Sequence, residues 1–391
     1  MRVRRTRRPL HCDDLFAAIV QTEKSGRKAG ITTGRSVLLR LGPSAAREPV
    51  GQPVGTPPFL YFNRPASATR ASNARASLRR CRLSGMEQAP APGEQAPSDV
   101  FRSGFAALLG RPNVGKSTLL NALLGERVAP TNPKPQTTRR RLRGILTTQS
   151  YQLVFIDTPG YHVPKDNLGR YLVQTAKGAV AQADAVVVIL DAGDLRPVDL
   201  ELLETVREAG KPALGLLNKA DLLAAGAAPP SGLPELEGGG YLFTSALTGS
   251  GLAEFVKRLA ELMPAGPLYY DAEQVTAEPL RELAAEFIRE AALGLLHQEV
   301  PYALEAVIEN FKPRSPELTY ISARLYVERA SQVGIVVGRG GAQLRKIGFQ
   351  ARKRLEKLLD TKVYLDLRVK VKPKWRKDEN ALREFGYRRK G

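Results

Sequence analysis

The stretch Gly110-Arg111-Pro112-Asn113-Val114-Gly115-Lys116-Ser117 matches the pattern G-x-x-x-x-G-K-[ST] and directly follows the apolar run 105–109. Glycines let the backbone bend so that successive N–H groups point at phosphates, and a helix beginning near Ser117 and Thr118 directs its positive end toward them. Lys116 supplies a cation for the outer phosphates, and the Ser117 hydroxyl suits Mg²⁺. The stretch predicts a nucleoside triphosphate site with magnesium; the alternative is an ordinary glycine-rich turn between strand and helix.

Length and charge narrow the class of protein further. A chain of 391 residues is long enough for two or three domains, and its formal net charge is +20. The positive charge lies at both ends, in residues 1–85 and 321–391, whereas the middle of the chain is mildly acidic. This asymmetry predicts a polyanion partner for the C-terminal third, with nucleic acid favoured over a membrane surface.

Cysteine usage and hydropathy indicate a reducing compartment and a soluble protein. The two cysteines, Cys12 and Cys81, both lie in the N-terminal segment, so the rest of the chain has no thiol for disulfides or metal sites. No apolar run approaches the roughly 20 residues that cross a bilayer.

Residues 1–100 are predicted to be a basic extension without a fold of its own. Three interpretations of residues 1–85 remain open: an organellar transit peptide, a disordered basic arm, or translated upstream sequence before a true start at Met86. Asp13, Asp14 and two glutamates count against a transit peptide, which is normally poor in acids. The expected location is the bacterial cytoplasm, or a mitochondrion or chloroplast if a transit peptide is present.

The remaining chain predicts two α/β units separated by a linker at 266–279. In residues 101–265, short apolar runs at 105–109, 151–156, 185–190, 213–217 and 241–244 alternate with helical segments, which predicts a mostly parallel sheet covered by helices on both faces. Residues 280–391 predict a smaller α+β domain, with helices at 280–297 and 342–359 and strands at 300–311, 318–329 and 363–371.

Three further motifs follow successive strands of the larger unit. Asp157-Thr158-Pro159-Gly160 offers a carboxylate for Mg²⁺ and a backbone N–H for the terminal phosphate. Asn218-Lys219-Ala220-Asp221 offers a carboxylate that can accept from the N1–H and amine of guanine, a donor pair that adenine lacks. Ser245-Ala246-Leu247 is expected to place backbone N–H near the guanine oxygen. The order of the motifs favours this interpretation over isolated helix caps.

This set of motifs resembles the translation-factor-type GTPases, and the resemblance implies switch residues. A threonine between the phosphate loop and Asp157 closes over Mg²⁺ in such proteins; the sequence offers Thr138, with Thr137 as the alternative, in a loop that could also be merely basic and flexible. Tyr161 stands where Ras-like enzymes carry the glutamine that orients water. Similarity to the TrmE and Era group of GTPases suggests that Asn113 helps bind K⁺ in compensation; otherwise Asn113 caps the loop.

The C-terminal unit contains Gly338-Arg339-Gly340-Gly341, a G-x-x-G sequence between two helical segments. In KH domains such a loop clamps about four nucleotides of RNA. A plain turn is the alternative, but the basic neighbours Arg329, Arg345 and Lys346 favour RNA.

A guanine-nucleotide domain followed by a KH-like domain resembles the Era family of GTPases. The resemblance extends from about residue 104 to residue 387 and includes Gln136-Thr-Thr-Arg139, Val300-Pro-Tyr302 and Lys374-Trp375-Arg376. The resemblance implies a type II KH domain, binding near the 3′ end of small-subunit ribosomal RNA, a role in assembling that subunit, peripheral association with the inner membrane, and a monomer. Two alternatives stay open: a passive RNA-binding assembly factor with negligible hydrolysis, and a related GTPase acting on tRNA or the large subunit.

Overall fold

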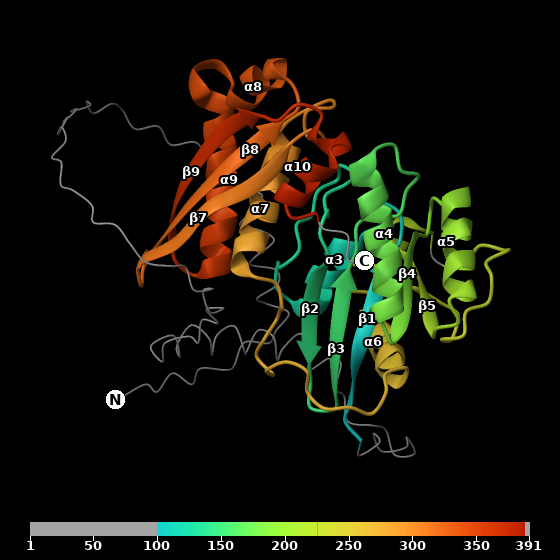
Figure 1. Ribbon diagram of the computed structural model, residues 1–391. Helices are drawn as coiled ribbons and strands as arrows, with labels where there is room; N and C mark the ends of the chain where they lie inside the picture. Colours follow the sequence, from blue (N-terminus) through green and yellow to red (C-terminus); the bar gives the residue numbers. More distant parts are fainter. Residues whose placement is uncertain (1–99, 225, 388–391) are drawn as a thin grey trace, which may run out of the picture. The chain divides into compact units, whose positions relative to one another are not determined.

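The computed structural model of the chain describes residues 100–224 and 226–387. The interpretations of residues 1–99 therefore lie outside the described residues. Within the described part the strands form a six-stranded sheet of order β2-β3-β1-β4-β5-β6 and a three-stranded sheet of order β7-β8-β9 (Figure 1).

The larger sheet is parallel except for β2, which pairs antiparallel with β3, so the predicted mostly parallel sheet is confirmed. Its strands are β1 (Arg102–Leu109), β2 (Leu142–Thr147), β3 (Tyr151–Asp157), β4 (Ala185–Asp191), β5 (Ala213–Asn218) and β6 (Tyr241–Phe243). The associated helices are α3 (Lys116–Leu124), α4 (Asn167–Gln182), α5 (Pro197–Glu208), the short η2 (Ala220–Leu222) and α6 (Leu252–Glu261).

Continuous apolar runs form these strands because both faces of the sheet are buried. In β4, every residue from Ala185 to Leu190 has no solvent exposure. Alternate side chains join two different hydrophobic clusters, Val187 on one face and Val188 on the other. The carboxyl ends of the parallel strands consequently meet at one edge of the sheet, and the predicted nucleotide motifs follow those ends.

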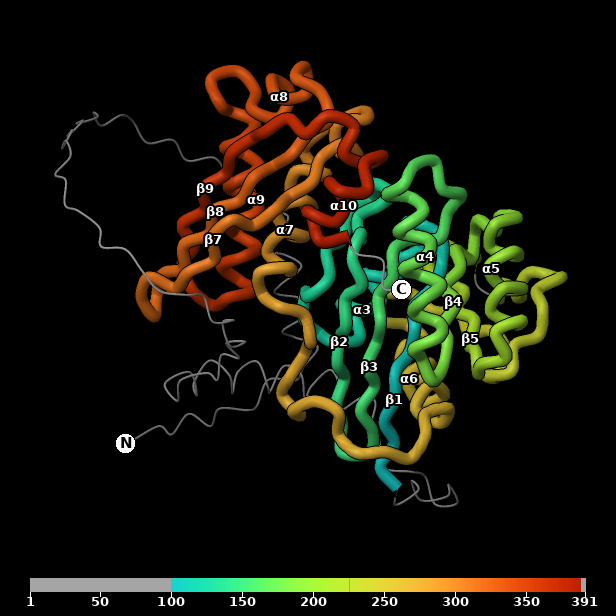
Figure 2. Tube along the Cα trace, in the orientation of Figure 1, coloured from blue at the N-terminus to red at the C-terminus, as the bar shows by residue number. Residues whose placement is uncertain are grey.

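Two features of this part differ from the sequence-based expectation. Strand β2 was not predicted, because its apolar run is short and interrupted by Arg143 and Gly144. The predicted linker hydrogen-bonds to the sheet: Val275 accepts from the Ile145 N–H at 2.8 Å, and Gly266 donates to the Phe101 carbonyl at 3.2 Å. Figure 2 shows the segment between α6 and α7 crossing below β1 and β3 and then following β2.

The C-terminal part forms a smaller α+β unit, also as predicted. It contains α7 (Leu280–Leu295), β7 (Glu305–Ser315), β8 (Leu318–Val327), α8 (Ala330–Val337), η3 (Arg339–Gly341), α9 (Ala342–Leu359), β9 (Lys362–Val371), η4 (Trp375–Lys377) and α10 (Glu379–Glu384). Helices α7 and α9 pack on one face of its sheet (Figure 1).

The first strand of this unit was predicted too early. Residues 300–303 form turns, in which the Ala303 N–H donates to the Glu299 carbonyl, and β7 begins only at Glu305. Pro301 lacks the N–H that a strand ladder needs, which explains the displacement. No helix within residues 100–224 and 226–387 combines the length and apolar character needed to cross a bilayer.

Candidate nucleotide and RNA sites

The phosphate loop joins β1 to α3 and holds the Lys116 ammonium against its own carbonyls. Lys116 Nζ donates to the carbonyl oxygens of Gly110 at 3.0 Å and Arg111 at 2.8 Å. Gly115 has φ +103°, and a Cβ there would lie 2.2 Å from Asn218 Nδ2. Only glycine allows this close approach, through which the Asn218 amide donates to the Val114 carbonyl at 2.7 Å.

The Arg111 side chain anchors the loop and does not face the phosphate position. Its Nε lies 2.7 Å from Asp199 Oδ2 at the start of α5, and its guanidinium also donates to the Asp194 carbonyl. Asp199 is fully buried. Of the loop residues predicted to contact phosphate, Arg111 therefore contributes only its backbone, and its ion pair was not anticipated from the sequence.

Three side chains converge where the sequence places magnesium. Ser117 Oγ donates to Asp157 Oδ2 at 2.7 Å, and Thr138 Oγ1 lies 2.9 Å from Ser117 Oγ and 3.4 Å from Asp157 Oδ2. The Thr137 hydroxyl instead donates to the Lys134 carbonyl at 2.8 Å, which favours Thr138 over Thr137 as the switch residue. Asp157 Oδ1 is buried, and no hydrogen-bond partner for it lies in the described part of the chain. This oxygen-rich set fits Mg²⁺.

Burial gives the two central charges of the site unusual proton affinities. Burial lowers the pKa of the Lys116 ammonium to about 8, although attraction by Asp157 opposes the shift. Burial likewise raises the pKa of Asp157 to about 6, against the attraction of Lys116 and the hydroxyl hydrogen bonds. A ligand of opposite sign would favour the charged form of each group further: a phosphate beside Lys116 and a divalent cation beside Asp157.

The segment after Asp157 closes against the phosphate loop. Thr158 Oγ1 donates to the Leu108 carbonyl at 2.7 Å, and a Cβ on Gly160 would lie 2.6 Å from the Pro112 nitrogen. The Tyr161 N–H donates to the Gly110 carbonyl at 3.0 Å, while its side chain packs against the hydrophobic cluster that contains Leu109. The Tyr161 ring is thus partly buried against this cluster, and its N–H is engaged by the phosphate loop.

The predicted base site is built around Asn218, which connects three loops. Its Oδ1 accepts from the Ala246 N–H at 2.9 Å, which holds the predicted segment 245–247 beside Asn218. Asp221 accepts from Ser245 Oγ at 2.5 Å and is itself exposed, with its carboxylate available to a base. Lys219 Nζ lies 2.6 Å from Asp191 Oδ2, and the Leu247 side chain is 80% exposed.

Asn113 connects the phosphate loop to the loop between α3 and β2, which contains Thr137 and Thr138 and is called the switch loop below. Its Nδ2 donates to the Pro133 carbonyl at 2.7 Å, and its φ is +68°. The side chain spans the two loops and does not cap the phosphate loop locally. The contact is made by the Asn113 amide nitrogen; the amide oxygen of the same side chain and the Pro133 carbonyl are oxygens of the kind that coordinate K⁺.

Two arginines connect the switch loop to the C-terminal unit, one from each side of the contact. Arg139 is fully buried; its Nη1 lies 2.7 Å from Glu305 Oε2, and its guanidinium also donates to the Leu304 and Tyr302 carbonyls. Arg289 of α7 donates to the carbonyls of Gln136 and Thr137. These contacts fix the backbone on both sides of Thr138. Sequence reasoning missed them, because Gln136-Thr-Thr-Arg139 does not identify the partner of Arg139 and Arg289 belongs to no motif.

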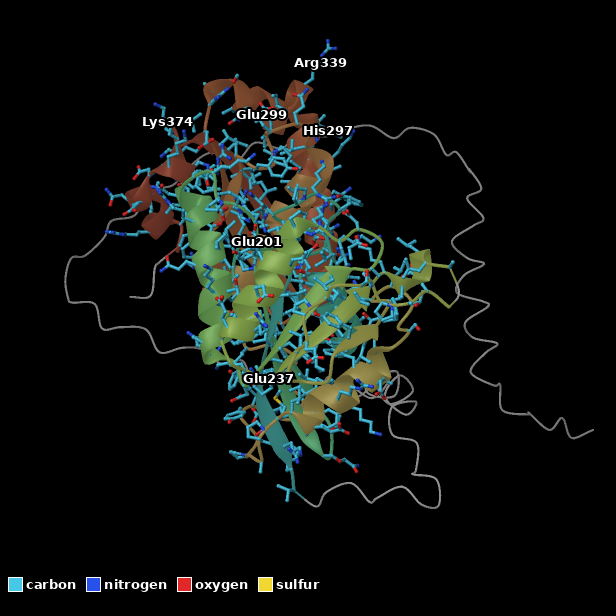
Figure 3. All side chains as sticks on the ribbon, turned by 90° about the vertical axis from the view of Figure 1, so that its right-hand side faces the viewer. Glu201, Glu237, His297, Glu299, Arg339 and Lys374 are labelled. Atoms are coloured by element: carbon cyan, nitrogen blue, oxygen red, sulfur yellow. The ribbon has the colours of Figure 1, made fainter. Side chains whose placement is uncertain are left out.

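The G-x-x-G loop lies between α8 and α9 with its backbone exposed. Gly340 has φ +56°, and an added Cβ would meet no atom within 4 Å, so the position is open to a ligand. The predicted neighbours Arg329, Arg339, Arg345 and Lys346 are all exposed. Figure 3 shows the Arg339 side chain extending away from the ribbon. The helix α9 starts directly after Gly341 and directs its N-terminus at this loop.

Comparison with known proteins agrees with this division of the chain. Residues 105–219 match the family model described as a 50S ribosome-binding GTPase, and residues 299–376 match the model described as a KH domain. Fold and site together define a P-loop GTPase that carries a C-terminal KH domain.

Full-length relatives make the assignment specific. The chain is 43% identical over 296 residues to GTPase Era of Geotalea uraniireducens strain Rf4, covering 73% of this chain and 98% of the relative. It is 44% identical over 305 residues to GTPase Era of Synechocystis, and the match covers 75% of this chain and 95% of the relative. The chain belongs to the Era family of GTPases.

Two solved structures resemble the whole described part. One is Era in complex with MgGDPNP and nucleotides 1506–1542 of 16S ribosomal RNA, with TM-score 0.69, 38% identity, and coverage of 73% of this chain and 99% of that chain. The other is a variant of Aquifex aeolicus Era bound to GDP·AlF4⁻, with TM-score 0.68, 37% identity and the same coverage.

The buried pair of Arg139 and Glu305 yields a stability prediction. Glu305→Ala leaves the Arg139 guanidinium buried without its carboxylate, so we expect the free energy of unfolding to fall by about 3–5 kcal/mol. Urea unfolding followed by circular dichroism measures this. The control is Glu254→Ala, which breaks the exposed pair with Arg258 and should cost no more than about 0.5 kcal/mol. Equal small losses in both variants would contradict the prediction.

Proposed function

We propose that this GTPase acts in assembly of the small ribosomal subunit, where its KH domain binds single-stranded ribosomal RNA near the 3′ end. The observation that carries this function is the coexistence of a guanine-nucleotide site and an exposed G-x-x-G loop in one family member. A solved Era with 38% identity and near-complete coverage contains 16S ribosomal RNA nucleotides 1506–1542 together with MgGDPNP. The named relatives are bacterial, which supports action in the bacterial cytoplasm.

In the proposed reaction, GTP is split to GDP and phosphate, and the side chains of the site position the charges. Ser117, Thr138 and Asp157 would hold Mg²⁺, which neutralises charge on the phosphates. Lys116 and the backbone N–H groups of the phosphate loop stabilise the negative charge on the transferred phosphoryl group. Asp221 selects guanine, while Asn218 holds the surrounding loops in place.

We further propose that K⁺ supplies positive charge that the side chains lack. Tyr161 cannot orient water as a glutamine would, because its ring packs against the hydrophobic cluster and its N–H donates to Gly110. Asn113 spans the phosphate loop and the Pro133 carbonyl, next to the position of the phosphates. A cation held there would stabilise charge that develops during hydrolysis.

RNA binding by the KH domain is proposed to respond to the nucleotide through the switch loop. Thr138 is the residue that senses the Mg²⁺ position, and Arg139 directly after it is buried against Glu305 of β7. Release of Thr138 after hydrolysis would therefore disturb contacts with the KH domain.

The base-specificity assignment predicts a changed nucleotide preference. Asp221→Asn removes the carboxylate that accepts two guanine hydrogen bonds, so GTP affinity should fall by about tenfold to a hundredfold, while xanthine nucleotide affinity rises. Displacement of a fluorescent nucleotide measures both constants. Glu201→Ala, an exposed acid on α5, is the control. Unchanged preference for GTP in Asp221→Asn would mean that the base site is misplaced.

The potassium assignment predicts a salt-specific rate. We expect GTP turnover of the unaltered protein to be about tenfold or more faster in K⁺ than in Na⁺, and Asn113→Ala to abolish that difference. Phosphate release at matched ionic strength provides the measurement. Equal rates for both proteins in both salts would refute the assignment.

The RNA-binding assignment predicts that a negatively charged side chain in the G-x-x-G loop weakens RNA binding. Asp tolerates positive φ, so Gly340→Asp should preserve the fold but repel the RNA backbone and weaken its binding by about tenfold or more. Crosslinking in cells, followed by sequencing, identifies the RNA. The matched control is Gly232→Asp, at another open position with positive φ. Recovery of small-subunit RNA equal to that of the unaltered protein would oppose the assignment.

A further inference from the structure

The sheet of the KH domain has one face that its helices do not cover. In β9, Val363, Leu365 and Leu367 pack with the hydrophobic cluster beneath α7 and α9. The alternate residues of the same strand therefore point to the opposite face of the sheet. Register pairs Tyr364 with Tyr320 of β8 in one row of that face. The residue pairing between β8 and β9 therefore shows which side chains lie on the outer face of the sheet.

Tyr320 and Tyr364 form a stacked aromatic pair on this outer face. Their ring centroids lie 5.8 Å apart with an interplanar angle of 30°, and the Arg314 guanidinium lies 4.9 Å from the Tyr320 centroid. The Tyr364 side chain is 63% exposed. A row of one guanidinium and two rings therefore presents flat π surface to solvent, where no packing of the described core requires it.

The surroundings of the aromatic row are basic. Lys312 lies opposite Tyr320 in the ladder, and Lys362 and Arg368 lie on the same side of β9 as Tyr364; all three are exposed. Asp366 pairs with Arg368 at 3.1 Å and Glu309 pairs with Arg324, so the positive charge that remains beside the rings is that of Arg314, Lys312 and Lys362. Free positive charge beside exposed rings matches a nucleic acid strand in both charge and shape.

This surface is separate from the G-x-x-G loop. The loop precedes α9, whereas β9 begins at Lys362, just beyond the other end of that helix. The 18 residues of α9 span about 27 Å. The outer face also has a covered end, where Tyr326 contacts Phe385 with centroids 4.8 Å apart. The aromatic row occupies the end that remains open.

We propose that Tyr320, Tyr364 and Arg314, with Lys312 and Lys362, form a second binding surface for single-stranded RNA, which rests on the RNA-binding function proposed above. Unpaired bases stack on the two rings, and the basic side chains meet the phosphates on either side. Stacking does not depend on the identity of the base. This surface therefore adds affinity for an RNA strand of which another segment is bound by the G-x-x-G loop.

Fluorescence anisotropy with two labelled, unstructured oligonucleotides tests the second surface in the full chain. One of about 4 nucleotides fills the clamp alone, and one of about 16 nucleotides can reach beyond it. For the double variant Tyr320→Ala/Tyr364→Ala we expect the affinity for the longer strand to fall by about tenfold to a hundredfold, with unchanged affinity for the shorter one. The control Tyr320→Phe/Tyr364→Phe keeps the rings and should bind both strands normally.

Each outcome decides between the two proposals. Unchanged binding of the longer strand by the alanine variant overturns the second surface, and so does an equal loss for both strands, which would indicate general damage to the fold. Gly340→Asp should weaken both oligonucleotides. If it does while the alanine variant binds normally, only the second surface is wrong. If the unaltered protein binds neither strand, the proposed RNA function fails and the second surface fails with it.

Discussion

Lys116 and Asp157 carry opposite charges and are both buried at one edge of the larger sheet, and the loops around them are arranged to satisfy these charges. Charges removed from water must be paired or hydrogen-bonded. The phosphate loop meets this requirement by turning two carbonyls toward the Lys116 ammonium, and Ser117 and Thr138 turn their hydroxyls toward Asp157. The loop geometry, the close approach at Gly115 and the inward position of the switch threonine all serve this arrangement.

The same constraint reaches the second sheet through the residue after Thr138. Arg139 cannot leave the interior without leaving Glu305 buried and unpaired, and Glu305 also accepts from the Tyr387 hydroxyl at 2.7 Å. Breaking a buried pair costs far more than breaking an exposed one. The position of Thr138 is therefore tied through the buried Arg139 to the first strand of the KH domain and, through Glu305, to Tyr387 near the C-terminus.

Features that depend on residues close together in the chain could be predicted from the sequence, whereas contacts between distant segments could not. The phosphate loop, the strands before Asp157 and Asn218, and helix α9 follow from periodicity and turn chemistry, so they could be located from residue type and spacing. The Arg111–Asp199 and Arg139–Glu305 pairs could not, because each joins segments far apart in the chain and the motifs that contain the arginines do not identify the partner carboxylates. The KH strand displaced to Glu305 shows that one proline can outweigh an apolar run.

Tyr161 connects the segment after Asp157 to the phosphate loop and to the hydrophobic cluster beside it. Its N–H and ring tie the segment after Gly160 to the phosphate loop and to the interior, which removes a side chain that could orient water. Positioning and charge stabilisation supply most of the catalysis in phosphoryl transfer, so the proposed function leaves this chemistry to the bound cations and the phosphate loop. In that proposal a long-lived GTP state would keep Thr138 and Arg139 in place, together with the contacts to the KH domain. The rate of hydrolysis would then set how long the protein holds its RNA.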